Sequence, residues 1–316
     1  MRAIAEKGLG GVILFDRDQL TGNRRNIADP DQVTALIQSL QAAAPRPIVI
    51  SIDQEGGRVA RLNSSDGFRA TRSEADIGAA DDASLARSWS QNIAADLARI
   101  GVTLNFAPVV DLDVNPTNPA IGALGRSFSA DPAVVVAMAT REIRAHHQKR
   151  IRTTLKHFPG LGSATGNTDF GIVDVTGTWH RSELAPFRDL ISDGMPDAVM
   201  VAHLLNRNLD PDLPASLSRA VVTDLLRGRL GWQGPVVSDD LQAAAITKRF
   251  GEARAVTLAL AAGVDVLLFA NQQIYDSAVV DHVVDSVFDA VRSGDLTESR
   301  IEQAATRADR LRTPPA

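Results

Sequence analysis

Short apolar runs of strand length recur along the chain, separated by longer segments with helical spacing. Residues within a run are apolar at successive positions instead of alternating with polar ones. This pattern is typical of parallel strands that helices cover on both faces. Gly, Pro or Asp bounds most runs, as expected where strands end in turns. The predicted strands are residues 11–15, 47–52, 102–106, 153–157, 197–203, 235–238 and 264–269.

The segments between these runs have the features of amphipathic helices. Asp29 and Asp131 each precede a Pro, which places a capping side chain before a residue suited to the first helical turn. Apolar residues then recur at helical spacing, as they do at positions 85, 89, 93 and 97. A terminal helix is predicted after residue 297, and the helix that carries His146 and His147 is expected to lie at the surface.

Polar residues cluster where the predicted strands end. The carboxyl ends of parallel strands meet at one end of a barrel, where barrel enzymes keep their active sites. We therefore predict a single α/β domain over residues 1–316, folded as a TIM-type (β/α)8-like barrel. Seven predicted strands instead of eight indicate an incomplete barrel or a chain that begins after the first strand. The clustered residues are Asp16, Arg17, Asp53, Gln54, Glu55, Asn105, Asp111, Lys156, His157, His203, Asp239 and Asp240.

Composition narrows the classes of function. A formal net charge of −5 without a basic stretch argues against a nucleic-acid partner and favours neutral substrates. The chain has no cysteine, which excludes disulfides and thiolate metal sites. No apolar run reaches the roughly 20 residues of a membrane helix, and the first residues lack a signal-peptide cleavage site. The chain as given is expected to be cytoplasmic, with a secreted or lipoprotein form expected if its N-terminus is truncated.

Three segments carry candidate chemistry. Residues 51–61 pass from an apolar strand into acids, two glycines and two arginines, which suits either sugar hydroxyls or a capped turn with surface ion pairs. Lys156 and His157 precede a Gly-rich loop able to close over a ligand, although their order does not match a phosphate-binding loop. Asp239 and Asp240 end a third strand, and only one of them is expected to face the barrel mouth because strand side chains alternate.

The residues alone leave several roles open. Asp239 fits a nucleophile, a metal ligand or a helix N-cap. Lys156 also fits the Schiff-base lysine of an aldolase, and His203 fits either a site residue or a structural hydrogen bond. The six histidines do not form a zinc-spaced set, so neither a metal nor another cofactor is predicted. The sequence is silent on oligomeric state.

Several segments together resemble glycoside hydrolase family 3, in its branch of bacterial β-N-acetylglucosaminidases. They occur in family order over nearly the whole chain, and their combination is highly specific. The matching segments are GGVILFDRD, ISIDQEGGRVARL, GVTLNFAPVVDLDVNP, GRSFS, LKHFPG, MVAHLLN and GPVVSDDL.

This resemblance implies a barrel active site in which Asp239 is the nucleophile of a retaining glycosidase. It implies a carbohydrate substrate, a terminal β-linked N-acetylhexosamine or related β-hexoside, with muropeptide recycling as the setting. The family mechanism needs no metal. The residues implied to grip the sugar are Asp53, Arg61, Arg126, Lys156 and His157, to which His203 is added as a candidate from its place at a strand end.

The loop after LKHFPG departs from the family pattern. The branch has a His where Leu161 stands, and an Asp-x-His pair, whose His is the acid/base, where Asn167 and Asp169 stand. Three readings follow. Asp169 replaces the His as acid/base, with a pKa raised by burial or by the charge of Asp239. Another acid, such as Glu55 or Asp174, swings in. Or protonation is weak, and the protein cleaves only activated glycosides or merely binds sugars.

Overall fold

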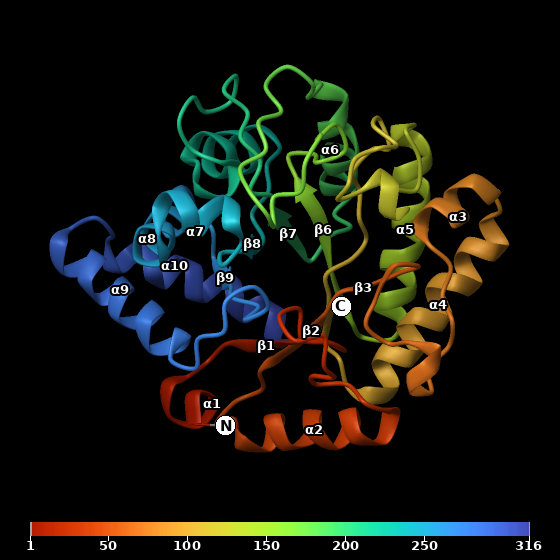
Figure 1. Ribbon diagram of the computed structural model, residues 1–316, viewed down its shortest axis with the longest axis horizontal. Helices are drawn as coiled ribbons and strands as arrows, with labels where there is room; N and C mark the ends of the chain where they lie inside the picture. Colours follow the sequence, from red (N-terminus) through yellow and green to blue (C-terminus); the bar gives the residue numbers. More distant parts are fainter. Residues whose placement is uncertain (1, 316) are drawn as a thin grey trace.

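The computed structural model describes residues 2–315. Its centre is a curled parallel sheet of seven strands in the order β1-β2-β5-β6-β7-β8-β9, with helices packed around the outside (Figure 1). The predicted α/β architecture is confirmed, with seven strands in the sheet instead of eight. The strands of this sheet are β1 (Gly11–Leu14), β2 (Val49–Ile52), β5 (Leu104–Asn105), β6 (Arg152–Phe158), β7 (Ala198–Val201), β8 (Val236–Asp240) and β9 (Val266–Leu268).

Each of the seven strands overlaps a predicted one, with ends that differ by a few residues. A second, two-stranded sheet was not predicted; it pairs β3 (Gln54–Gly56) with β4 (Val59–Ala60) in antiparallel fashion. Gly56 and Gly57 both have positive φ, at 102° and 58°, which glycine adopts without steric cost. This hairpin turns the chain directly after β2, so that Asp53, Glu55 and Arg61 are brought to the same strand end.

The helices follow the βα alternation of the sequence. As predicted, the Asp29 side chain accepts a hydrogen bond from Gln32 N, and the Asp131 side chain accepts one from Ala133 N. No described helix is long and apolar enough to span a bilayer. The helices are α1 (Arg2–Lys7), α2 (Pro30–Ala43), α3 (Glu74–Ala80), α4 (Ala83–Ile100), α5 (Pro132–Gln148), α6 (Ala185–Ser192), α7 (Ala244–Phe250), α8 (Glu252–Ala262), α9 (Val279–Ser293) and α10 (Glu298–Ala308), with a π-helical segment, η5 (Ala220–Arg229), between β7 and β8.

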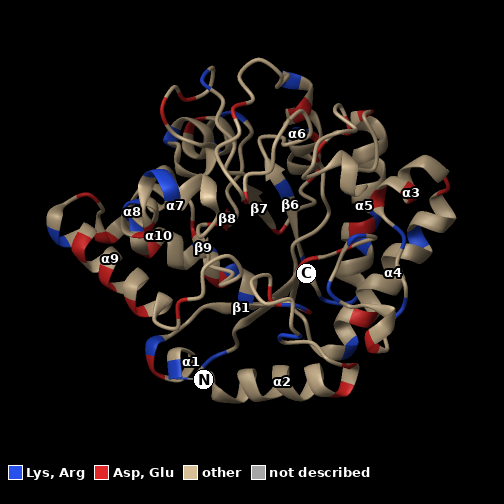
Figure 2. Cartoon of the chain, viewed as in Figure 1, with Lys and Arg blue, Asp and Glu red and all other residues tan. Residues whose placement is uncertain are grey.

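Apolar side chains pack on both faces of the curled sheet, which explains the continuous apolar runs. One large cluster fills the space between the sheet and the helices. A smaller inner cluster fills the inside of the curl, and Leu311 near the end of the chain completes it. Lys, Arg, Asp and Glu are interspersed along the outer helices (Figure 2). The inner cluster consists of Leu104, Phe106, Ala198, Met200, Val237 and Leu311, with Ile13, Val49, Val266 and Leu268 packed against it.

The first and last strands are joined through the loops that follow them. Gln272, after β9, accepts a hydrogen bond from Gln19 N at 2.7 Å and donates one to Arg17 O at 3.1 Å. Arg25 donates to the carbonyls of Ala270 and Asn271 at 2.9 and 3.1 Å. These side chains close the gap at the carboxyl ends of the strands.

Two acids, Glu74 on α3 and Glu142 on α5, are fully buried. Glu74 Oε1 accepts a hydrogen bond from Val109 N at 3.1 Å. Its second oxygen and both oxygens of Glu142 find no hydrogen-bond partner among the described residues. Burial raises the pKa of both carboxyls, with further contributions from the charges of Glu142 on Glu74 and of Glu55 on Glu142.

This pair makes stability depend on pH. A carboxyl with a raised folded-state pKa holds a proton that the unfolded chain has lost, so the free energy of unfolding decreases as pH rises above the ordinary glutamic acid pKa. Glu142→Gln removes one of the two ionisable groups that cause this decrease, and it is expected to stabilise the protein by on the order of 1 kcal/mol at pH 8. The gain should be smaller at pH 5, as measured by urea unfolding. Glu302→Gln, on exposed α10, is the control, and an equal gain at both pH values would contradict this account.

Candidate active site

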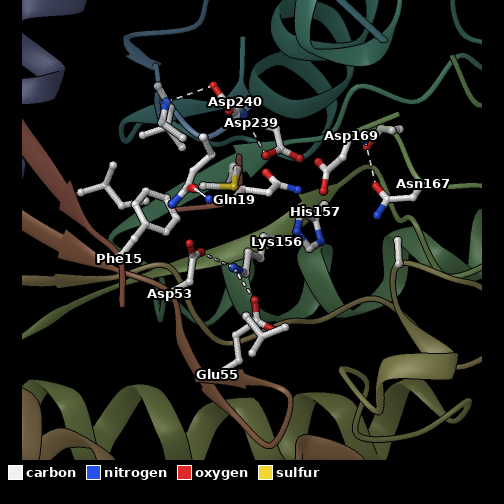
Figure 3. A pocket seen from close by; sticks show the side chains of 18 of the residues that line it. Phe15, Gln19, Asp53, Glu55, Lys156, His157, Asn167, Asp169, Asp239 and Asp240 are labelled. Atoms are coloured by element: carbon white, nitrogen blue, oxygen red, sulfur yellow. Dashed lines mark hydrogen bonds and ion pairs between the residues drawn. The ribbon is translucent and has the colours of Figure 1, made fainter. Parts of the chain in front are cut away.

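A cavity of about 440 Å³ lies at the carboxyl ends of the parallel strands (Figure 3). Its floor includes Ile13, Met200 and Leu268, which also belong to the inner apolar cluster. Most charged groups of its walls come from the end of β8 and from the segments after β1, β2, β5 and β6, and the segment after β9 adds Gln272. Among the predicted site residues, the structure brings together at this cavity Asp53, Arg61, Arg126, Lys156, His157, Asp169 and Asp239.

Lys156 lies at the centre of a charged corner. Its Nζ is 2.8 Å from Asp53 Oδ1 and 2.6 Å from Glu55 Oε1. Arg126 holds Glu55 in a bidentate pair, with Nε and Nη2 each 2.7 Å from a carboxylate oxygen. This paired geometry adds strength and direction to the interaction. Arg61 extends the corner, with Nη2 3.5 Å from Asp53 Oδ2 and its guanidinium over the Phe15 ring.

The charges in this corner fix the protonation states. Burial opposes ionisation of Asp53, but Lys156 and Arg61 outweigh it and lower its pKa. Burial likewise opposes ionisation of Glu55, whose pKa is lowered by Arg126 and Lys156. Burial alone would favour the neutral form of Lys156, but the charges of Asp53 and Glu55 outweigh burial and raise its pKa. Lys156 is therefore a charged donor, unsuited to attack as a neutral amine, and Glu55 is a poor proton donor.

His157 is oriented by Asp111, a buried carboxylate that was expected among the residues at the strand ends but was given no role there. Asp111 Oδ2 accepts a hydrogen bond from His157 Nδ1 at 2.7 Å, and Asp111 Oδ1 accepts one from Leu161 N, also at 2.7 Å. His157 Nε2 then lies 3.3 Å from Arg126 Nη2. Adjacent side chains in a regular strand point to opposite faces, but Lys156 and His157 both line the cavity. The peptide bond between these two residues is cis.

Asp239 and Asp169 point into the cavity from different elements (Figure 3). Asp239 is near the end of β8, and its Oδ1 accepts a hydrogen bond from Asp240 N at 2.8 Å. Asp169 is on the long loop after β6, where its carbonyl accepts a bond from Ala244 N at 3.0 Å. Burial raises the pKa of Asp169, and the charge of Asp239 raises it further. The two carboxylates are thus close enough to interact electrostatically.

The altered loop residues have structural contacts in place of catalytic ones. Asn167 Oδ1 accepts a hydrogen bond from Asp169 N at 2.8 Å and so shapes the turn that presents Asp169. Leu161 is buried, with a fractional exposure of 2%. Asp174, considered as an alternative acid, is exposed and paired with Arg207 at 3.0 Å. Of the acids weighed for proton transfer, Asp169 is the one with both the position and the raised pKa.

Several expectations from the sequence need correction. His203 does not border the cavity: its side chain is fully buried and bonded to Ser216 Oγ and Asp240 O, which corresponds to the second role left open for it, a structural hydrogen bond. Asp240 does border the cavity beside Asp239, whereas only one of the pair was expected to. The helix that carries His146 and His147, α5, is in the outer layer as expected, but the His146 side chain is buried within it, and burial lowers its pKa to about 4.

One group of potential metal ligands occurs among the described residues. Glu252, Asp276 and His282 each bring a ligand atom within 4.8 Å of the others. They do not line the cavity, and His282 Nδ1 is already hydrogen-bonded to Asp276 Oδ2 at 2.8 Å.

Comparison with known proteins gives one consistent result. Residues 1–311 match the model of the glycosyl hydrolase family 3 N-terminal domain. A protein of Xylella fastidiosa named beta-hexosaminidase is 37% identical over 287 residues, covering 87% of this chain and 80% of that protein. A protein of the same name from Tolumonas auensis is 36% identical over 278 residues, covering 86% of this chain and 79% of its own length.

Two solved structures agree with these relatives. A family 3 β-N-acetylglucosaminidase from Paenibacillus superposes with a TM-score of 0.87 at 36% identity, covering 98% of this chain and 57% of its own. A β-N-acetylhexosaminidase from Beutenbergia cavernae superposes with a TM-score of 0.87 at 32% identity, covering 98% of this chain and 91% of its own. This chain belongs to glycosyl hydrolase family 3 and is a glycosidase.

Proposed function

We propose that this protein is a retaining β-N-acetylhexosaminidase that removes a terminal β-linked N-acetylhexosamine through a covalent intermediate on Asp239. The observation that carries the proposal is the pair of carboxylates, Asp239 and Asp169, that point into one cavity beside a charged corner suited to sugar hydroxyls. The names of the β-hexosaminidase and β-N-acetylglucosaminidase relatives support the choice of sugar. Muropeptide fragments that end in such a sugar are the natural substrates we propose.

The charged corner binds and orients the sugar. Asp53 and Glu55 accept hydrogen bonds, while Lys156, Arg61 and Arg126 donate them, so adjacent hydroxyls meet donors and acceptors of fixed geometry. His157, held by Asp111, keeps its Nε2 toward the cavity side of the corner. Because these groups already neutralise one another, the binding site needs little rearrangement when a neutral sugar enters.

The reaction proceeds in two displacements at the anomeric carbon. In the first, an oxygen of Asp239 forms a bond to the anomeric carbon as the bond to the aglycone oxygen breaks. Asp169, protonated at the outset, transfers its proton to that leaving oxygen. In the second, Asp169 takes a proton from water, and the water oxygen displaces Asp239, which releases the sugar and restores both groups.

Asp169 is suited to this double role because its environment favours the protonated form at the outset. Burial and the charge of Asp239 raise its pKa. Once Asp239 is esterified, its charge is gone, so the pKa of Asp169 falls and it becomes ready to act as a base. Asp169 thus acts as an acid in the first step and as a base in the second, while Asp239 is the nucleophile and then the leaving group.

Hydrolysis of two aryl glycosides tests the proposal. We expect release of 4-nitrophenol from 4-nitrophenyl N-acetyl-β-glucosaminide at a higher kcat/KM than from 4-nitrophenyl β-glucoside. Retention is checked by proton NMR of the first-formed sugar, which should be the β-anomer. If the sugar binds but even these activated glycosides remain intact, the protein is a carbohydrate-binding barrel without the proposed activity.

A further inference from the structure

The residue after the proposed nucleophile is held at three places. The Asp240 main-chain N–H donates to Asp239 Oδ1 at 2.8 Å. The Asp240 carbonyl accepts a hydrogen bond from His203 Nε2 at 2.8 Å. The Asp240 carboxylate accepts from Gln242 N at 3.0 Å and from Ala270 N at 3.1 Å. Asp240 therefore connects the end of β8 to β9 and, through His203, to β7.

The contacts of His203 determine where its proton lies. A carbonyl oxygen only accepts hydrogen bonds, so Nε2 must carry the hydrogen that points at Asp240. In a neutral ring, Nδ1 is then an acceptor, and the Ser216 hydroxyl lies 2.7 Å away to donate to it. Burial lowers the pKa of His203, although the charge of nearby Asp239 acts in the opposite direction. Both ring nitrogens are satisfied without a charge on the ring.

Ser216 is itself fixed. It is fully buried, and its N–H donates to the carbonyl of Ala202 at 3.0 Å, directly before His203 in the chain. Side chain and main chain of Ser216 thus both bind the segment that follows β7. This arrangement leaves the imidazole one orientation in which both of its hydrogen bonds are made.

The hydrogen bond from Asp240 makes the two carboxylate oxygens of Asp239 different. Asp239 Oδ1 is engaged by the Asp240 N–H, and Oδ2 accepts no hydrogen bond within residues 2–315. An oxygen that already accepts a hydrogen bond is the weaker nucleophile of the two, because its lone-pair density is shared with the donor. Oδ2 is therefore the stronger nucleophile of the two oxygens.

We propose that His203 and Ser216 are positioning residues, which hold Asp240 so that its N–H fixes Asp239 with Oδ2 directed at the anomeric carbon. The inference rests on the proposed function of Asp239. Neither side chain borders the cavity, so neither touches the sugar. Their contribution is to the first displacement, because a misplaced attacking atom raises the barrier without weakening the binding of the sugar.

The test compares three variants of the full chain with 4-nitrophenyl N-acetyl-β-glucosaminide. His203→Phe keeps a ring but loses both hydrogen bonds, and we expect kcat to fall about 100-fold, since a displacement near 1 Å costs that much. KM should change by less than about threefold, because uniform binding is retained. His203→Gln offers an amide donor and an acceptor oxygen at similar reach, and should recover most of the rate. Ser216→Ala should give an intermediate loss.

Two further measurements distinguish a role in positioning Asp239 from a general effect on the stability of the fold. The rate constant for inactivation by a 5-fluoro glycoside should fall in parallel with kcat, with the inactivator's binding constant little changed. The matched control is His147→Phe, which removes the hydrogen bond to Asp197 before β7, at the opposite end of the strands. That variant should lower the melting temperature and leave kcat unchanged.

Three outcomes would overturn the inference. The first is a wild-type inactivation rate in His203→Phe, and the second is a loss that His203→Gln does not recover at equal melting temperature. If His203→Phe does not fold, Ser216→Ala and His203→Gln decide the question, and unchanged kcat in Ser216→Ala is the third. Failure of the proposed function is recognised separately, because the unsubstituted protein would then neither turn over the aryl glycoside nor be labelled at Asp239.

Discussion

Replacing Asp239 by asparagine is expected to lower kcat for an aryl N-acetyl-β-hexosaminide by about 10⁴-fold or more, as losses of covalent nucleophiles do. The amide has nearly the same shape, so the hydrogen bond from Asp240 N can persist while the attacking charge is lost. KM should change far less than kcat, because the sugar contacts in the charged corner remain. Melting temperatures of the two proteins should be similar.

Covalent trapping locates the nucleophile directly. Incubation with a 2-fluoro or 5-fluoro glycoside should label the unsubstituted protein, and peptide mass spectrometry should place the label on the peptide that contains Asp239. The Asp239→Asn protein should remain unlabelled. A matched control is Asp174→Asn, since Asp174 is exposed and paired with Arg207. A label on any other peptide, or full activity in Asp239→Asn, would move the nucleophile elsewhere.

Replacing Asp169 by alanine should give a loss that depends on the leaving group. General acid catalysis contributes about 10²–10⁴-fold, and this contribution matters most when the aglycone is a poor leaving group. Disaccharide hydrolysis should therefore fall by that amount, whereas formation of the glycosyl-enzyme from a dinitrophenyl glycoside should change little. Azide, small enough to enter the space left by Asp169, should accelerate turnover of the activated substrate and give a β-glycosyl azide.

The pH dependence provides a second measurement on Asp169. Its pKa is raised, first by burial and then by the charge of Asp239. Activity requires the protonated form in the first step, so kcat/KM should decline as pH rises through this pKa, and Asp169→Ala should lack that decline. In Asp239→Asn the negative charge is removed, so the pKa of Asp169 should be lower than in the unsubstituted protein, measured by carboxyl-carbon NMR. An unchanged basic limb in Asp169→Ala would exclude Asp169 as the acid.

The fold could be predicted well because buried parallel strands have a local signature. Several strands of the main sheet, such as β1 and β7, are continuous apolar runs, which can be recognised without knowledge of contacts elsewhere in the chain. The β3–β4 hairpin was missed because strands of three and two residues are too short to show a period. The prediction of a surface helix at His146 did not show that this side chain faces inward. His146 continues the helical spacing of buried Met138 and Glu142 on α5.

The rule that active sites lie at strand ends placed Asp53, Lys156 and Asp239 among the clustered residues. Arg61, Arg126 and Asp169 do not end a strand, and they were expected at the site from the resemblance to the family. The roles of Glu55 and Asp111 arise from partners 71 and 46 residues away, Arg126 and His157, which no local pattern reveals. The two roles of His203 could not be told apart from the sequence for the same reason. The His203 side chain turns away from the cavity because it is hydrogen-bonded to Ser216, a residue 13 positions along the chain.

Leu311 completes the inner apolar cluster, and this cluster determines from which side a sugar can reach the cavity. Ile13, Met200 and Leu268 belong to this cluster and also line the cavity, so apolar packing inside the curl bounds the cavity on that side. A sugar therefore enters from the side of the loops. We expect a pocket bounded in this way to accept the end of a glycan more readily than its interior, so the proposed hydrolase should release single sugars from chain ends.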